Sequence, residues 1–135
     1  MNNFDHERLD VYQTALKFVI LADKIVEGLP KGRSYLSNQL HRAALSIPLN
    51  TAEGAGEFSP ADKARFYRIA RRSATECAAI LNICRYLKLA ETEFLTDGRK
   101  FLLRVVAMLT RMIKMQASSG SQAGSGSQAG SGSKD

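Results

Sequence analysis

The sequence predicts an all-α protein, an antiparallel up-down-up-down four-helix bundle followed by a flexible, disordered tail. Apolar residues recur at helical spacing in four segments, and short stretches rich in glycine or proline separate these segments. The last 18 residues are almost all Ser, Gly, Gln and Ala, a composition that cannot bury apolar surface. We therefore expect the bundle over residues 1–117 and a flexible linker or tail over residues 118–135.

The first helix is expected from about Asp5 to Glu27. Its apolar residues recur every three or four positions, and Leu16 and Ile20 belong to this stripe. The segment 28–32 contains two glycines and a proline, which stop a helix. A tight connection to the second helix is therefore expected here.

The second helix is expected from about Ser34 to Glu53, and it contains Pro48. Proline removes one backbone donor and clashes with the preceding turn. We expect a kink near residues 46–47, after which the helix resumes; a full break at Pro48 is the alternative. Residues 54–56, Gly-Ala-Gly, are expected to form a flexible turn.

The third helix has the clearest start signal in the chain. Ser59 can cap the first free amides, Pro60 suits the first helical position, and Asp62 complements the helix dipole. Apolar residues at helical spacing then define one face as far as about Leu89. This start signal fixes where the second connection ends.

The fourth helix is expected from about Thr92 to Gln116. Its apolar residues cover an arc of roughly 140°, broader than the ~100° that a surface helix needs. The surplus fits either a self-association surface or a deeply buried helix. Gly98 points into this arc, where a close approach of two helices would explain it.

Catalytic and metal-binding patterns are not apparent, so we expect no enzyme, no cofactor and no metal site. Cys77 and Cys84 lie two helical turns apart, roughly 10.5 Å, which is beyond disulfide reach, and buried free thiols are expected. His6 and His41, the only histidines, have no neighbouring ligand or nucleophile pattern. No stretch approaches the ~20 apolar residues of a membrane span, and the polar N-terminus is unlike a signal peptide, so a cytoplasmic protein is expected.

The net charge of +6 is concentrated in two parts of the chain. Residues 31–72 carry eight basic and three acidic side chains, whereas residues 99–117 carry five basic side chains and no acidic one. Arginines dominate the third helix, as phosphate recognition favours. Cations on the outer faces of these helices either form an ordinary solvated surface or contact a polyanion. The candidate nucleic-acid-binding residues are Arg42, Arg65, Arg68, Arg71, Arg72, Lys100, Arg104, Arg111 and Lys114.

A family resemblance rests on two stretches, residues 39–54 (QLHRAALSIPLNTAEG) and residues 65–76 (RFYRIARRSATE). They resemble the pattern "Q-L-x-R-A-x-x-S-I-x-x-N-I-A-E-G … R-F-x-x-I-A-R-G-S-x-x-E" of the four-helix-bundle family of ribosomal RNA intervening sequences, which is related to the accessory variability determinant of diversity-generating retroelements. Two positions depart from the pattern: Arg72 stands in place of a glycine, and Glu57 stands where arginine is frequent.

The resemblance implies a four-helix bundle without catalytic activity, in a cytoplasmic bacterial or phage-related protein. It further implies a basic homopentamer that binds RNA and assists a retroelement reverse transcriptase. The polar pattern residues Asn50 and Glu53 would satisfy backbone groups released at Pro48. The leading hypothesis is therefore a homo-oligomeric RNA-binding accessory protein, and the alternative is a self-assembling protein-interaction scaffold.

Overall fold

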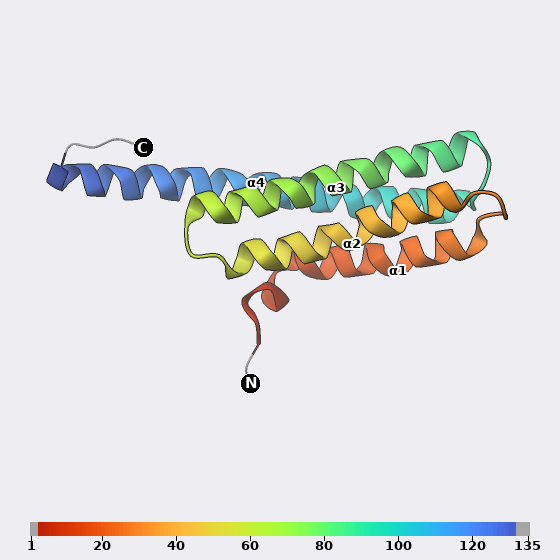
Figure 1. The fold of residues 1–135 in the computed structure, drawn as a ribbon, viewed down its shortest axis with the longest axis horizontal. Helices are drawn as coiled ribbons and strands as arrows, with labels where there is room; N and C mark the ends of the chain where they lie inside the picture. Colours follow the sequence, from red (N-terminus) through yellow and green to blue (C-terminus); the bar gives the residue numbers. More distant parts are fainter. Residues whose placement is uncertain (1–2, 132–135) are drawn as a thin grey trace.

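The computed structural model describes the backbone of residues 3–131 and the side chains of residues 3–120. Within this range, all regular structure is helical, as predicted. The elements are the 3-10 helix η1 (Asp5–Arg8) and the α-helices α1 (Asp10–Gly28), α2 (Ser34–Gly56), α3 (Pro60–Tyr86) and α4 (Thr92–Ser131). Consecutive helices run in opposite directions, which gives the predicted up-down-up-down bundle (Figure 1).

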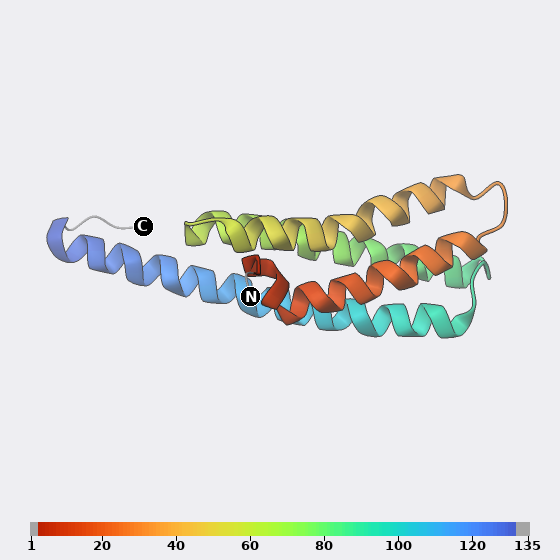
Figure 2. The ribbon, with the colours of Figure 1, turned by 90° about the horizontal axis from the view of Figure 1, so that it is seen from below.

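Each helix of the bundle packs against its two neighbours. α2 contacts α1 and α3, and α4 contacts α3 and α1, so the four helices close into a ring around one core. Figure 2 shows the same bundle from below, with η1 at the end where α2 and α3 meet. α3 packs along both α2 and α4. Its outer face therefore lies between these two helices, at the centre of a surface formed by α2, α3 and α4.

The core is apolar and contributed by all four helices. Phe18 of α1, Ile47 of α2, Cys77 of α3 and Leu102 of α4 are among its fully buried side chains. Gly98 marks the tightest approach in α4, since a Cβ there would lie 2.9 Å from the Leu81 Cδ1 atom. The close helix contact expected at Gly98 is confirmed.

The first helix differs from the expectation at its start and on one face. Residues 5–8 form η1, and Leu9 is extended before α1 begins at Asp10. The Phe4 amide donates to the Glu7 carboxylate at 2.7 Å, which stabilises this separate turn. Ile20, predicted in the apolar stripe, is 60% exposed, because the buried face of α1 is centred on Phe18 and Ile25 instead.

α2 continues through Pro48 without a break, and Figure 2 shows it bending near its middle, as expected of a kink. Two side chains one turn after the bend bond to its carbonyls: Asn50 Nδ2 donates to Ser46 O at 2.9 Å, and Thr51 Oγ1 donates to Ile47 O at 2.7 Å. Proline leaves the carbonyl four residues earlier without its donor. Asn50 therefore reinforces the bend at Ser46 but does not reach the orphaned carbonyl of Ala44.

The flexible turn predicted at residues 54–56 is wrong, because these residues form the last turn of α2. The reason is a cap supplied by α3: Lys63 Nζ donates to Ala55 O at 2.9 Å and to Gly54 O at 3.4 Å. A cation at a helix C-terminus satisfies free carbonyls and complements the dipole. The connection between α2 and α3 is correspondingly short.

α3 begins as predicted and ends slightly earlier than predicted. Ser59 Oγ accepts from the Asp62 amide at 3.0 Å, and Pro60 occupies the first helical position. The helix ends at Tyr86 and not near Leu89, because Lys88 adopts a positive φ of 57° and the Leu89 amide turns back to the Cys84 carbonyl at 2.9 Å. This left-handed turn closes the helix.

α4 extends past its predicted end near Gln116 and continues to Ser131. The residues after Gln116 are rich in Gly and Ser, which are poor helix formers, so the sequence does not predict this extension. Beyond Gly120, which lies beside Pro60 of α3, α4 projects past the ends of the other helices (Figure 1). The last part of the predicted tail, residues 132–135, lies outside the described residues.

Candidate nucleic-acid interface

Polar residues of the family pattern form a seam between α2 and α3. Arg42 Nη2 lies 2.6 Å from Glu76 Oε2, and Ser73 Oγ donates to Ser46 Oγ at 2.7 Å. Asn50 Nδ2 joins the same network by donating to Ser46 Oγ at 2.9 Å. The pattern therefore describes how α2 is held against α3. Because the guanidinium of Arg42 is paired at 2.6 Å across the two helices, we assign it mainly to packing, although its side chain is 62% exposed.

Two further candidate arginines are engaged by their own surroundings. Arg71 Nη1 donates to Thr110 Oγ1 at 3.2 Å and so links α3 to α4. Arg65 lies over the Phe66 ring, 4.4 Å from its centroid, and 3.7 Å from the carboxylate of Asp62. The guanidinium of Arg65 is exposed, so this loose pair is weak and leaves it accessible.

The remaining candidate cations are exposed and have no ion-pair partner among the side chains of residues 3–120. The contact between Arg71 and Thr110 places one stretch of α3 level with one stretch of α4. Five candidates, Arg71 included, lie on these two stretches. We call them the α3–α4 basic cluster: Arg68, Arg71, Arg72, Arg111 and Lys114.

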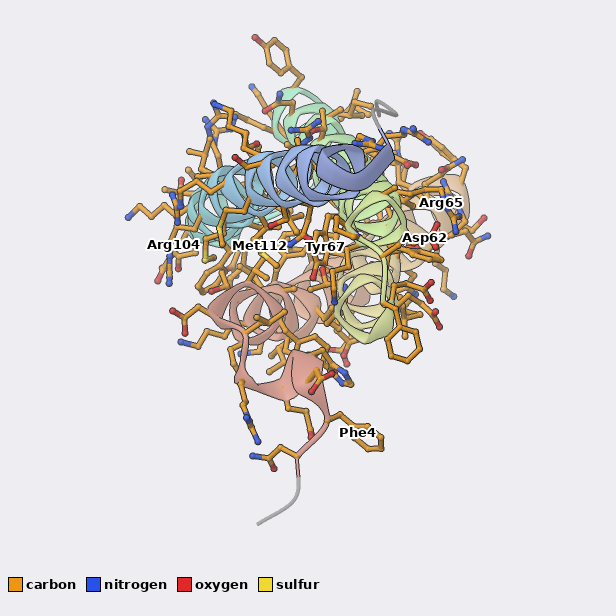
Figure 3. All side chains as sticks on the ribbon, turned by 90° about the vertical axis from the view of Figure 1, so that its left-hand side faces the viewer. Phe4, Asp62, Arg65, Tyr67, Arg104 and Met112 are labelled. Carbon is orange, nitrogen blue, oxygen red and sulfur yellow. The ribbon has the colours of Figure 1, made fainter. Side chains whose placement is uncertain are left out.

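The other two candidates on α4, Lys100 and Arg104, lie nearer the middle of the bundle. Figure 3 shows Arg104 and Arg65 on opposite flanks, so the predicted residues do not converge on one point. The structure instead gives a broad basic surface, with the α3–α4 basic cluster at its centre. Arg72, which replaces a glycine of the family pattern, is exposed here and adds charge without disturbing packing.

Local sequence makes this surface predominantly positive. Residues 63–75 of α3 and residues 98–131 of α4 contain no Asp or Glu. Carboxylates at i+4 usually neutralise basic helix faces. Among the exposed candidates only Arg72 has one, Glu76, and that carboxylate is paired with Arg42. A surface with several exposed cations and few carboxylates attracts polyanions.

Acidic side chains occupy different parts of the molecule. Asp10 and Asp23 are exposed on α1, and Glu53 and Glu57 line a hollow beside Phe4 near the start of the chain. Glu57, which stands where the family pattern frequently has arginine, therefore contributes its charge away from the α3–α4 basic cluster.

The buried titratable groups do not suggest chemistry. Burial raises the pKa of the Cys77 thiol to about 12, with a smaller contribution from Glu76, and burial also raises the pKa values of Cys84 and Tyr67. Thiols with raised pKa values are poor nucleophiles. Within the described residues, no group of three or more His, Cys, Asp or Glu side chains is arranged to hold a metal ion.

The broad apolar arc of α4 is explained largely by burial. Leu95, Leu102 and Leu109 are buried, and flanking residues such as Phe101 and Met112 pack against the core. Among the described side chains of α4, the large apolar residues that stay exposed are Leu103 (58%) and Met115 (62%). Among the described helices, none is long and apolar enough to cross a membrane.

The sequence did not identify two residues that the structure brings to notice, Lys63 and Arg99. Lys63 was not predicted as a helix cap, because its partners belong to another helix. Arg99 lines a groove with Leu103 and Val106, and membership of the acid-free segment of α4 was the signal that could have identified it.

Together these features define the class: a small four-helix-bundle protein whose α3–α4 surface is basic. The family model of the 23S rRNA-intervening sequence protein matches residues 7–111. The chain belongs to this family, as its sequence pattern indicated. No curated protein matches the sequence.

Proposed function

We propose that this protein is a non-catalytic, homo-oligomeric RNA-binding accessory protein that binds phosphates through its basic α3–α4 surface. The observation that carries the proposal is the α3–α4 basic cluster, set on helical segments without a single carboxylate. The family's association with 23S ribosomal RNA intervening sequences supports RNA as the polyanion. Phosphate contacts of this kind position a nucleic acid but carry little sequence preference.

A filter-binding titration against structured RNA at several salt concentrations tests this proposal. The variant Arg68→Gln/Arg72→Gln/Arg111→Gln removes three exposed cations of the cluster. Each phosphate contact contributes about 0.7 to the slope of log affinity against log salt for single strands, so the variant should lower the slope by about two.

The matched control is Lys17→Gln/Lys24→Gln/Arg85→Gln. It removes the same formal charge from exposed positions on α1 and at the far end of α3. The control should retain a slope close to that of the wild type. Absence of salt-sensitive binding by the wild type, or equal losses in the two variants, would contradict the proposal.

Self-association would strengthen this surface. Five subunits, the number expected from the family resemblance, would carry a formal charge of +30, five times the +6 of one chain. Light scattering during size-exclusion chromatography measures the subunit number directly. The resemblance also extends the proposal to assistance of a reverse transcriptase; a copurification assay with such an enzyme encoded nearby tests that step.

The second candidate function is a protein-interaction scaffold, and one observation favours it. Ile20, Leu45 and Leu49 are 60%, 49% and 63% exposed, and the first two line an apolar hollow between α1 and α2. Exposed apolar side chains grouped in this way are typical of protein contacts. Partners that remain bound after nuclease treatment of a pull-down would favour the scaffold over the RNA-binding protein.

A further inference from the structure

A groove runs between the start of α3 and the later part of α4. Its walls are Pro60, Ala61, Ala64 and Arg68 of α3 and Ile113, Gln116, Ala117 and Gly120 of α4. Its volume is about 380 Å³, within the ~300–1,000 Å³ of small-ligand sites. At its outer end the helices approach closely, since a Cβ on Gly120 would lie 3.8 Å from the Cβ of Pro60.

The lining of the groove has two chemical characters. Most of its walls are small or apolar side chains, which offer a surface to a flat, uncharged group. Arg68 supplies a cation within the groove, and the amide of Gln116 supplies both a hydrogen-bond donor and an acceptor. Lys114 follows Ile113 directly, so a second cation of the α3–α4 basic cluster lies beside the groove.

A ligand that fits this lining has an anionic part next to a flat apolar part with a polar edge. A nucleotide has this combination of a phosphate and a base. In a duplex the bases are stacked and paired, so their faces cannot enter a groove on a protein surface, whereas an unpaired base can be turned outward. Bases stack on aromatic side chains largely without regard to sequence. This groove has no aromatic lining, so a base here would pack against the apolar side chains of Pro60, Ala61 and Ile113.

We propose that the groove between α3 and α4 takes an unpaired base of a single-stranded nucleic acid, while Arg68 and its neighbours in the α3–α4 basic cluster hold the adjoining phosphates. This inference rests on the proposed function and narrows its substrate class from RNA in general to unpaired segments. Electrostatics alone gives the opposite preference, because a duplex has the higher charge density.

Fluorescence anisotropy with short labelled oligouridine, the matching single-stranded DNA, and an RNA duplex of equal length tests the proposal. Both single strands should bind about tenfold more tightly than the duplex, an effect near the lower end of that of one base stacked on an aromatic ring, because the groove offers only apolar side chains. Equal binding of RNA and DNA identifies the shared unpaired nucleotide as the ligand, and tighter binding of RNA adds a contribution from the 2′-hydroxyl.

Two variants fill the groove from opposite walls without changing charge and without adding an aromatic ring on which a base could stack: Ala61→Leu and Ala117→Leu. Both alanines are exposed, so neither variant should disturb the fold, and thermal melting checks this. The matched control is Ala79→Leu, also exposed and five helical turns along α3 from Ala61, about 27 Å away. The groove variants should lose the tenfold single-strand preference, whereas the control should keep it.

Three results would overturn the inference. They are duplex binding as tight as single-strand binding, unaltered preference in both groove variants, and competition by polyglutamate as effective as that by the single strand. Each of these leaves salt-dependent RNA binding, and hence the proposed function, intact. If no nucleic acid binds at low salt, the proposed function fails and the inference fails with it.

Discussion

Gly54→Ala is expected to destabilise the bundle, although alanine is the better helix former. Gly54 lies in the last turn of α2, where a Cβ would stand 2.6 Å from Cε1 and 2.8 Å from Cδ1 of Tyr67. The Lys63 carbonyl, 3.1 Å away, closes the other side. The Tyr67 ring is only 3% exposed and packs in the core, so it has little room to move.

The magnitude follows from two opposing effects. Overpacking a buried site costs about 1–3 kcal/mol, whereas replacing glycine by alanine within a helix gains up to ~1 kcal/mol. We expect a net loss of about 1–2 kcal/mol in the free energy of unfolding. For a domain of this size, that corresponds to a melting temperature lower by about 4–8 °C.

Urea denaturation and thermal melting, both followed by circular dichroism, measure this loss. Gly56→Ala is the matched control, because it lies in the same turn and a Cβ there meets nothing within 4 Å. The control should be as stable as the wild type or slightly more stable. If Gly54→Ala melts at or above the wild-type temperature, the Tyr67 ring is not fixed and the packing argument is refuted.

Three further outcomes are expected. The free energy of unfolding should fall as the pH rises from about 9 to 12. The Cys77 thiol ionises near 9.0 when unfolded but only at about 12 when folded, so the unfolded state releases its proton first. Urea titrations across this pH range measure the decline, which should be shallower in Cys77→Ala. Arg42→Gln should reduce stability by at most ~1 kcal/mol through loss of the pair with Glu76 and leave RNA affinity unchanged. Arg72→Gln should weaken RNA binding and leave stability unchanged. If Arg42→Gln weakens RNA binding more than Arg72→Gln does, Arg42 belongs to the interface. Deletion of residues 121–135 should leave the melting temperature unchanged, since Leu109 is the last buried apolar residue among residues 3–120; a marked decrease would show that the tail contributes to folding.

The sequence was sufficient to predict the fold because its signals are local. Helical periodicity and the Ser59-Pro60 start signal act within a few residues, and both were confirmed. One of the errors arose because a residue on another helix decided the outcome. Residues 54–56 stay helical because Lys63, on the next helix, caps them, and periodicity contains no information about that contact.

The candidate interface was predictable only in part, for the same reason. The outward direction of Arg68 and Arg72 follows from their positions on one helix, and both are exposed. The partner of Arg42 is 34 residues away, so its ion pair with Glu76 could not be inferred from spacing. The groove between α3 and α4 requires the register of two antiparallel helices, which the contact between Arg71 and Thr110 establishes.

The seam between α2 and α3 has a consequence for how such proteins diverge. Ser46, Ser73 and the Arg42–Glu76 pair, all part of the family pattern, join two helices, whereas the exposed Arg68 and Arg72 lie outside the pattern and are not needed for that task. Exchanging surface cations should therefore leave the architecture intact. One scaffold can then acquire different ligands while its recognisable signature stays the same.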